Sequence, residues 1–108
     1  MFEIKDNQIT LTRGDSAKML IELTQADGTE YPMQKGDVLT FTLRKKVEST
    51  GKLIEKIFNE KHIEFIPEDT VDLDFGNYVY DVVLTTSAGE VYTVVSVSNF
   101  VIAKEVHT

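Results

Sequence analysis

The chain has 108 residues, 42% of them hydrophobic, and a formal net charge of −7. This size and composition predict one domain, residues 1–108, with a single core, and exclude a disordered chain. The acidic balance argues against nucleic acid or a membrane surface as a partner. The lack of cysteine favours a reducing compartment. Neither a signal peptide nor a membrane-spanning segment is expected.

The first half of the chain predicts four strands separated by glycine-containing turns. They are expected at residues 9–12, 17–24, 38–45 and 52–58, with short additional pieces at 2–4 and 31–33. In the second strand Leu20 interrupts the polar face, and we expect a loop to cover it. The apolar residues of 52–58 fit helical spacing as well as strand spacing, but the segment is short and follows Gly51, so a strand is favoured.

The second half predicts a strand at 62–66, one helical turn at 67–73 and a β-hairpin. Proline suits the first position of a helix, which places the turn at Pro67. The first hairpin strand has strict period-two alternation, with one face formed by Tyr78, Tyr80, Val82 and Leu84. The polar segment 87–90 joins it to a strand at 91–97, and residues 99–102 extend or follow that strand before a polar tail at 103–108.

About seven strands at intervals of roughly ten residues predict an all-β fold, an immunoglobulin-like β-sandwich of antiparallel strands. The segment Asp74-Phe-Gly-Asn-Tyr-Val-Tyr80 resembles the Asp-x-Gly-x-Tyr-x-Cys signature of immunoglobulin-like domains. The resemblance implies that Tyr78 forms a tyrosine corner, with its hydroxyl bonded to backbone a few residues upstream. Tyr80 occupies the position of the family cysteine, and no tryptophan is present for strand C.

A second resemblance covers nearly the whole chain. It is carried by Ile9-Thr-Leu-Thr-Arg-Gly-Asp15, Lys35-Gly-Asp-Val-Leu-Thr-Phe-Thr-Leu-Arg44, Phe65-Ile-Pro-Glu-Asp-Thr70, Leu73-Asp-Phe-Gly-Asn-Tyr-Val-Tyr-Asp-Val82 and Val91-Tyr-Thr-Val94. These segments resemble small immunoglobulin-like proteins of phages and prophages of Gram-positive bacteria, and are similar to the N-terminal domain of phage upper baseplate proteins. The resemblance implies a non-enzymatic virion structural protein of a tail or baseplate, assembled in the bacterial cytoplasm, with other virion or tail proteins as partners. No catalytic residue and no cofactor are implied.

Charge is unevenly distributed along the chain. Residues 44–61 hold six basic and three acidic residues, a net charge of +3, whereas residues 62–108 have a net charge of −7. The candidate interaction residues are Arg44, Lys45 and Lys46 on the basic side and Glu68, Asp69 and Asp72 on the acidic side. Separate patches of opposite sign predict head-to-tail contact between copies, and thus a homo-oligomer. The alternative is that the two regions neutralise each other within one molecule.

Other functions have weaker signals. The alternative function is a carbohydrate-binding or adhesin-like surface module, for which Tyr31 and Tyr92 are candidates because the other tyrosines are assigned to the core. The acidic residues near 68–74 have no calcium-loop spacing, so capping and turn roles are favoured over a metal site. The sequence Arg13-Gly14-Asp15 is interpreted as a turn rather than an adhesion motif. No enzyme is expected, because the chain has two histidines but no cysteine, and no serine lies in a nucleophile motif.

Overall fold

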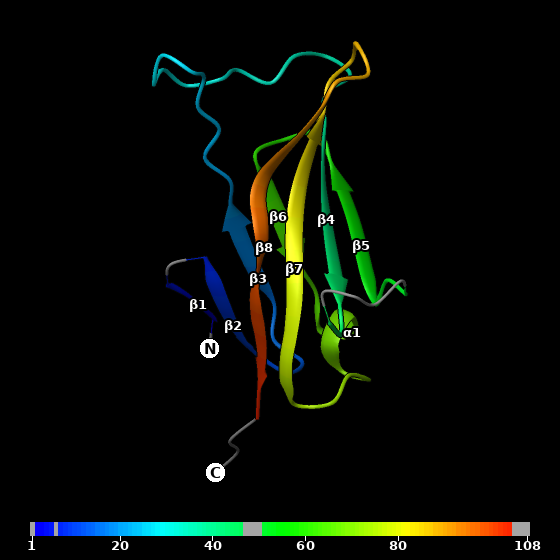
Figure 1. Ribbon diagram of the computed structural model, residues 1–108. Coiled ribbons are helices and arrows are strands. Elements are labelled where there is room, and N and C mark those ends of the chain that lie inside the picture. The colour runs from blue at the N-terminus through cyan, green and yellow to red at the C-terminus, as the bar shows by residue number, and fades with distance from the viewer. Residues whose placement is uncertain (1, 6, 47–50, 105–108) are drawn as a thin grey trace.

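The computed structural model describes residues 2–5, 7–46 and 51–104, and this part of the chain forms eight strands and one short helix (Figure 1). The elements are β1 (Phe2–Lys5), β2 (Gln8–Thr12), β3 (Ala17–Leu20), β4 (Val38–Arg44), β5 (Ile54–Phe58), β6 (His62–Phe65), α1 (Pro67–Thr70), β7 (Gly76–Thr85) and β8 (Val91–Ala103). The predicted all-β class is confirmed at this level. The helical turn is confirmed at Pro67–Thr70, within the longer range expected.

Two sheets share one core. The larger has the strand order β1-β2-β8-β7-β4-β5, and the smaller consists of β3 and β6. Figure 1 shows β3 and β6 on one face of the larger sheet. The rings of Phe41 on β4 and Phe65 on β6 join the two layers, with centroids 5.2 Å apart, and Phe100 on β8 packs against both. Such aromatic contacts supply much of the buried apolar surface of a small domain.

The alternation predicted for the hairpin strand is confirmed in β7. Tyr78, Tyr80, Val82 and Leu84 are buried, and the residues between them are partly exposed. The partner strand β4 places Leu39, Phe41 and Leu43 on the same inner face, opposite Leu84, Val82 and Tyr80. Period-two burial arises because successive side chains of a strand point to opposite faces of the sheet.

The expectation of a purely antiparallel fold is wrong. β2 pairs with β8 in parallel, from Ile9 opposite Phe100 to Thr12 opposite Ala103, and β1 pairs antiparallel with β2. Parallel neighbours need a long connection between them, and here almost the whole chain supplies it. The short piece expected at 2–4 is therefore a true strand, β1, at one edge of the larger sheet.

The second strand is shorter than predicted. β3 ends at Leu20, and the chain continues as an extended segment that we call the arm, residues 21–33. Ile21 donates its backbone N–H to the carbonyl of Lys61, and both Ile21 and Leu23 are buried. The alternation of buried and exposed residues thus continues after the β3–β6 ladder has ended. This explains why the predicted length of the second strand is too great. Leu20 is 76% exposed, so the expected loop over it is absent.

Three further expectations are resolved by the structure. Segment 54–58 is a strand rather than a helix, although it begins two residues later than predicted. β8 is continuous to Ala103, so residues 99–102 extend the last strand. The edge piece expected at 31–33 is not a strand, and the arm has only an isolated bridge between Thr24 and Glu30. Residues 105–108 of the predicted tail lie outside the described residues.

Within the described ranges, no helix has the length and apolar character that crossing a membrane requires.

Candidate functional site

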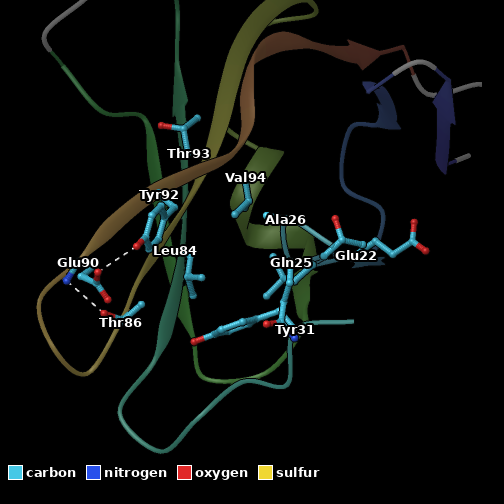
Figure 2. A pocket seen from close by; sticks show the side chains of 12 residues that line it. Glu22, Gln25, Ala26, Tyr31, Leu84, Thr86, Glu90, Tyr92, Thr93 and Val94 are labelled. Carbon is cyan, nitrogen blue, oxygen red and sulfur yellow. Dashed lines mark hydrogen bonds between the residues drawn. The ribbon is translucent and has the colours of Figure 1, made fainter. Parts of the chain in front are cut away.

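A pocket of about 590 Å³ lies between the arm and the β7–β8 hairpin, at the end of the molecule away from α1 (Figures 1 and 2). We call it the hairpin groove. It is lined by Glu22, Leu23, Thr24, Gln25, Ala26 and Tyr31 from the arm, and by Leu84, Thr86, Glu90, Tyr92, Thr93 and Val94 from the hairpin. Its apolar floor with polar side chains at the rim is typical of a binding site.

Asp37 fixes the arm to the sheet. Its Oδ2 accepts hydrogen bonds from the Tyr31 hydroxyl at 2.6 Å and from the Gln34 backbone N–H at 2.9 Å. Its Oδ1 accepts the backbone N–H of Ser87, after β7, at 3.0 Å. The bond from Tyr31 is the main cause that lowers the pKa of Asp37, and the same bond raises the pKa of Tyr31. One buried carboxylate therefore joins the arm, the start of β4 and the hairpin.

The hairpin side of the groove is organised by Glu90. Its backbone N–H donates to the Thr86 hydroxyl at 3.1 Å, and its carboxylate accepts the Tyr92 hydroxyl at 3.0 Å. This bond raises the pKa of Tyr92, whose side chain is half exposed. Figure 2 shows Tyr92 and Glu90 on one side of the groove, with Tyr31 and Gln25 on the other. The two tyrosines named from the sequence thus line the same space.

The electrostatic character of the groove is acidic. Glu90 contributes a carboxylate, whereas the carboxylate of Glu22 points away from the hairpin (Figure 2), and the described lining residues include no lysine or arginine. Gln25 is held by its own loop, because its side-chain amide donates to Thr29 and to the carbonyl of Glu30. The groove therefore offers aromatic faces, hydroxyls and negative charge, a combination suited to a polar or positively charged ligand.

The same end of the molecule contains an incompletely paired strand. β8 pairs with β7 along most of its length, but β2 pairs only with Phe100–Ala103. Among the described residues, none forms a backbone ladder with the opposite edge of residues 91–98. We call this the open edge of β8. Val91, Tyr92 and Val97 on this segment are 64%, 50% and 49% exposed.

The basic and acidic residues predicted for assembly partly meet within one molecule. Lys56 on β5 lies 2.8 Å from the Asp69 carboxylate of α1, and both side chains are largely buried. Arg44 lies 3.8 Å from Asp81 on the neighbouring β7. The expectation that the two regions occupy different places is therefore wrong for Lys56 and Asp69, because β5 and α1 are adjacent.

The remaining predicted residues are more exposed. Lys45 and Lys46 follow β4, and Lys45 lies over the Tyr78 ring, 4.5 Å from its centroid. Glu68 and Asp72 are exposed on α1 and in the turn after it. Of the six charged candidates, Arg44 and Asp69 thus face partners within the molecule, and the other four are exposed.

Two smaller motifs have structural roles. The Tyr78 hydroxyl donates to the carbonyl of Asp74 at 2.7 Å, the upstream backbone bond expected of this tyrosine. Gly14 has a φ of 84°, and its N–H donates to the buried Thr70 hydroxyl at 2.8 Å. The Arg13 guanidinium stacks 4.1 Å from the Phe75 ring centroid. The Arg-Gly-Asp turn is thus fastened to the segment around α1.

In the parts of the chain that the structure describes, no three histidine, cysteine or acidic side chains gather in a way that could hold a metal ion. His62 has its ring nitrogens 3.3 Å from Glu60 and 3.5 Å from Glu64. It lies on β6, away from the groove-lining residues.

No family model, characterised protein or solved structure matches this chain.

Sequence reasoning identified Tyr31 and Tyr92 but missed most of the groove. Glu90 and Thr86 are turn residues, and Asp37 follows a glycine turn, so each has an ordinary local interpretation. Their convergence depends on the arm folding over the hairpin. The one local signal is the uncharged run 91–97. It predicts a strand, but its apolar residues do not alternate with polar ones as they would in a strand with one buried face, and several of them are exposed in the structure.

Proposed function

We propose that the protein is a non-enzymatic module with an immunoglobulin-like β-sandwich that acts by protein–protein binding, as an adaptor in a phage tail or baseplate. The observation that supports this best is the exposed apolar surface of β8. Val91, Tyr92 and Val97 project from a strand segment without any charged residue. Exposed apolar side chains grouped along one segment of a small domain are typical of contact surfaces.

The composition of this surface favours protein as the partner. Contact regions between proteins are enriched in aromatic residues and depleted in lysine and glutamate at their centres. The segment 91–97 follows that pattern, with Tyr92 among valines, and acidic Glu90 lies at its border. The phage assignment itself is supported by the sequence resemblance, which includes Val91-Tyr-Thr-Val94 in this same segment.

The particle assignment is tested by quantitative mass spectrometry of purified phage particles, induced from the bacterium that encodes the chain. We expect the protein in the tail fraction in a fixed ratio to the other tail proteins. Its absence from intact particles and from isolated tails would contradict a virion role, whatever the protein binds in isolation.

A second candidate function, carbohydrate binding, is favoured by the hairpin groove. Tyr31 and Tyr92 line it together with Glu22, Gln25 and Glu90, and sugar sites commonly combine aromatic faces with carboxylate and amide groups. Calorimetric titration with soluble bacterial cell-wall polysaccharide tests it. Binding that is lost in Tyr92→Ala but kept in Val97→Ala, outside the groove lining, would support this function. An absence of heat at millimolar polysaccharide would exclude it.

A further inference from the structure

The open edge of β8 lies where the larger sheet stops short. β2 occupies the position next to β8 only from Phe100 to Ala103, because the chain turns between β1 and β2 at Asn7, just before β2 begins at Gln8. Beyond that turn, no described residue pairs with β8 at this position along residues 91–98. At about 3.3 Å per residue, this leaves roughly 26 Å of strand with unpaired backbone groups on one side.

Most of the usual protection of a strand edge is missing from this segment. Natural edges are blocked by lysine, proline, short length or a bulge, since an open edge pairs with other chains. Residues 91–98 contain no charge, no proline and no glycine, and four of the eight are valine. Two register irregularities in the β7–β8 ladder, between Tyr80 and Val82 and between Val82 and Val83, are the protective devices present opposite this segment. The segment thus has the composition that favours strand pairing.

The hairpin groove adjoins this edge and defines what can enter. Tyr92, Thr93 and Val94 belong to both the open edge and the groove lining, and the arm forms the opposite wall. Figure 2 shows the arm residues Glu22, Gln25 and Tyr31 across the groove from the hairpin. A strand added beside β8 would therefore place alternate side chains toward the groove.

We propose that the open edge of β8 binds an extended, basic segment of a partner protein by strand addition. Main-chain hydrogen bonds to residues 91–98 provide the affinity, and the carboxylate of Glu90 selects lysine or arginine side chains. The groove lining has no cation to oppose it. This deepens the proposed protein-binding role by naming the site and the chemistry of the partner, and it does not depend on the phage assignment.

The test uses the whole chain and a short probe, an acetylated peptide of about eight residues that alternates valine or threonine with lysine. Hydrogen exchange of the backbone amides is followed by NMR. In the free protein about every second amide of residues 91–98 should exchange quickly, because successive N–H groups point to opposite sides of a strand. The peptide should slow these amides and leave those bonded to β7 unchanged.

Matched probes separate strand addition from simple charge attraction. A peptide of the same sequence, N-methylated at alternate residues so that it cannot form the ladder, should bind at least about tenfold more weakly. A version with glutamate in place of lysine should also bind more weakly, and the lysine peptide should lose affinity for the variant Glu90→Gln. Equal binding of the N-methylated peptide would overturn the proposal.

Protein variants give an independent readout. Thr93→Lys places a like charge on the edge and should abolish binding of the lysine peptide, whereas Asn77→Lys, which adds the same charge on the exposed face of β7, should leave it intact. An unchanged NMR spectrum outside the hairpin verifies that Thr93→Lys is folded. Equal binding by both variants would overturn the proposal.

Two other outcomes would also overturn it. Protection of the edge amides that grows with protein concentration, without peptide, would show a second copy in place of a basic partner. A response of Tyr31 and Tyr92 to cell-wall polysaccharide, with none to the peptide, would assign the groove to sugar. Failure of strand addition leaves the mass spectrometry of phage particles unaffected, so the two proposals fail separately.

Discussion

At the scale of single residues, three buried tyrosine and aspartate contacts organise the domain. Tyr78 bonds to the backbone at Asp74, the Tyr80 hydroxyl donates to the carbonyl of Asn7, and Asp37 collects three donors from separate segments. Burial raises the pKa of Tyr80 to about 12, since an apolar environment disfavours the phenolate. Tyr80 and Asp37 connect segments that are far apart in the sequence, and Tyr78 closes the turn before β7.

Replacing Tyr78 with phenylalanine should lower the free energy of unfolding by about 1–3 kcal/mol, because the carbonyl of Asp74 loses its buried donor. Urea denaturation followed by circular dichroism measures the change. Tyr92→Phe is the control, since its hydroxyl bond is exposed and should matter little. Equal stability of Tyr78→Phe and the natural chain would refute the structural role of the Asp74 bond.

Phe41→Ala should lower the free energy of unfolding by about 3–5 kcal/mol, as for a fully buried ring.

Asp37 should make stability sensitive to acid. Its pKa in the folded chain is below the ordinary value of 3.8, so the unfolded chain binds a proton first as the pH falls. The stabilisation is therefore complete only well above the unfolded pKa, from about pH 5 upward, and is lost as the pH drops through the lower folded pKa. Thermal melts between pH 6 and pH 2 should show a smaller pH dependence in Asp37→Asn.

Asp27 provides the comparison for this acid effect. Its pKa is also lowered, by its hydrogen bonds with Thr29, but these lie within one exposed turn. Asp27→Asn should change the acid profile less than Asp37→Asn, which loses the carboxylate joining three segments. The reverse order would contradict the role assigned to Asp37.

At the scale of elements, α1 is held by side chains rather than by its own length. Asp69 accepts the backbone N–H of Ile66 at 2.8 Å and pairs with Lys56 on β5 at the same distance. Thr70 accepts the N–H of Gly14. A helix of four residues cannot persist alone, since helix nucleation is unfavourable. Its position therefore depends on these contacts.

Asp69→Ala should destabilise the domain by about 1–3 kcal/mol, because Ile66 loses an acceptor and Lys56 is left without its carboxylate. Chemical denaturation gives the value. Glu68→Ala, one residue earlier and exposed, should be close to neutral. A similar loss in both variants would indicate a general effect of acidic charge in place of the two named contacts.

The elements also show how far local patterns reach. β7 was predictable because one face packs against the core and the other faces outward, so alternation records burial. The end of β3 was not, because Ile21 and Leu23 remain buried on the arm after the ladder stops. The parallel pairing of β2 with β8 leaves no local pattern, because the partners are at opposite ends of the sequence. The hairpin groove was not predicted either, because its walls come from the arm and the hairpin, which are far apart in the sequence. Only its two tyrosines were identified.

At the scale of the whole molecule, the domain is elongated, 47 × 29 × 23 Å. The hairpin groove is acidic, whereas Lys45 and Lys46 are exposed nearer to α1. Lys56 and Asp69 pair within one molecule, so these two charges are not available for the head-to-tail contact predicted from the sequence. The exposed lysines can still meet an acidic surface of another copy.

If copies associate through these charges, sedimentation should show larger species at low salt and a monomer near 1 M salt, where the Debye length falls to about 3 Å. The double variant Lys45→Glu/Lys46→Glu should be monomeric throughout. Because Lys45 also lies over Tyr78, the unfolding midpoint of the variant must be measured alongside. A monomer at every salt and protein concentration would reject self-association and leave a different protein as the partner.

The parallel pair β2–β8 has a mechanical consequence. β2 enters the ladder at Ile9 and β8 leaves it at Ala103, at opposite ends of the paired region. A force that pulls these two ends apart slides the strands along each other, so all the hydrogen bonds between them bear the load together. The antiparallel β1–β2 hairpin is loaded differently, because tension on Phe2 opens its bonds one at a time. Under tension, β1 would peel away early while the β2–β8 ladder continued to hold the sheet closed.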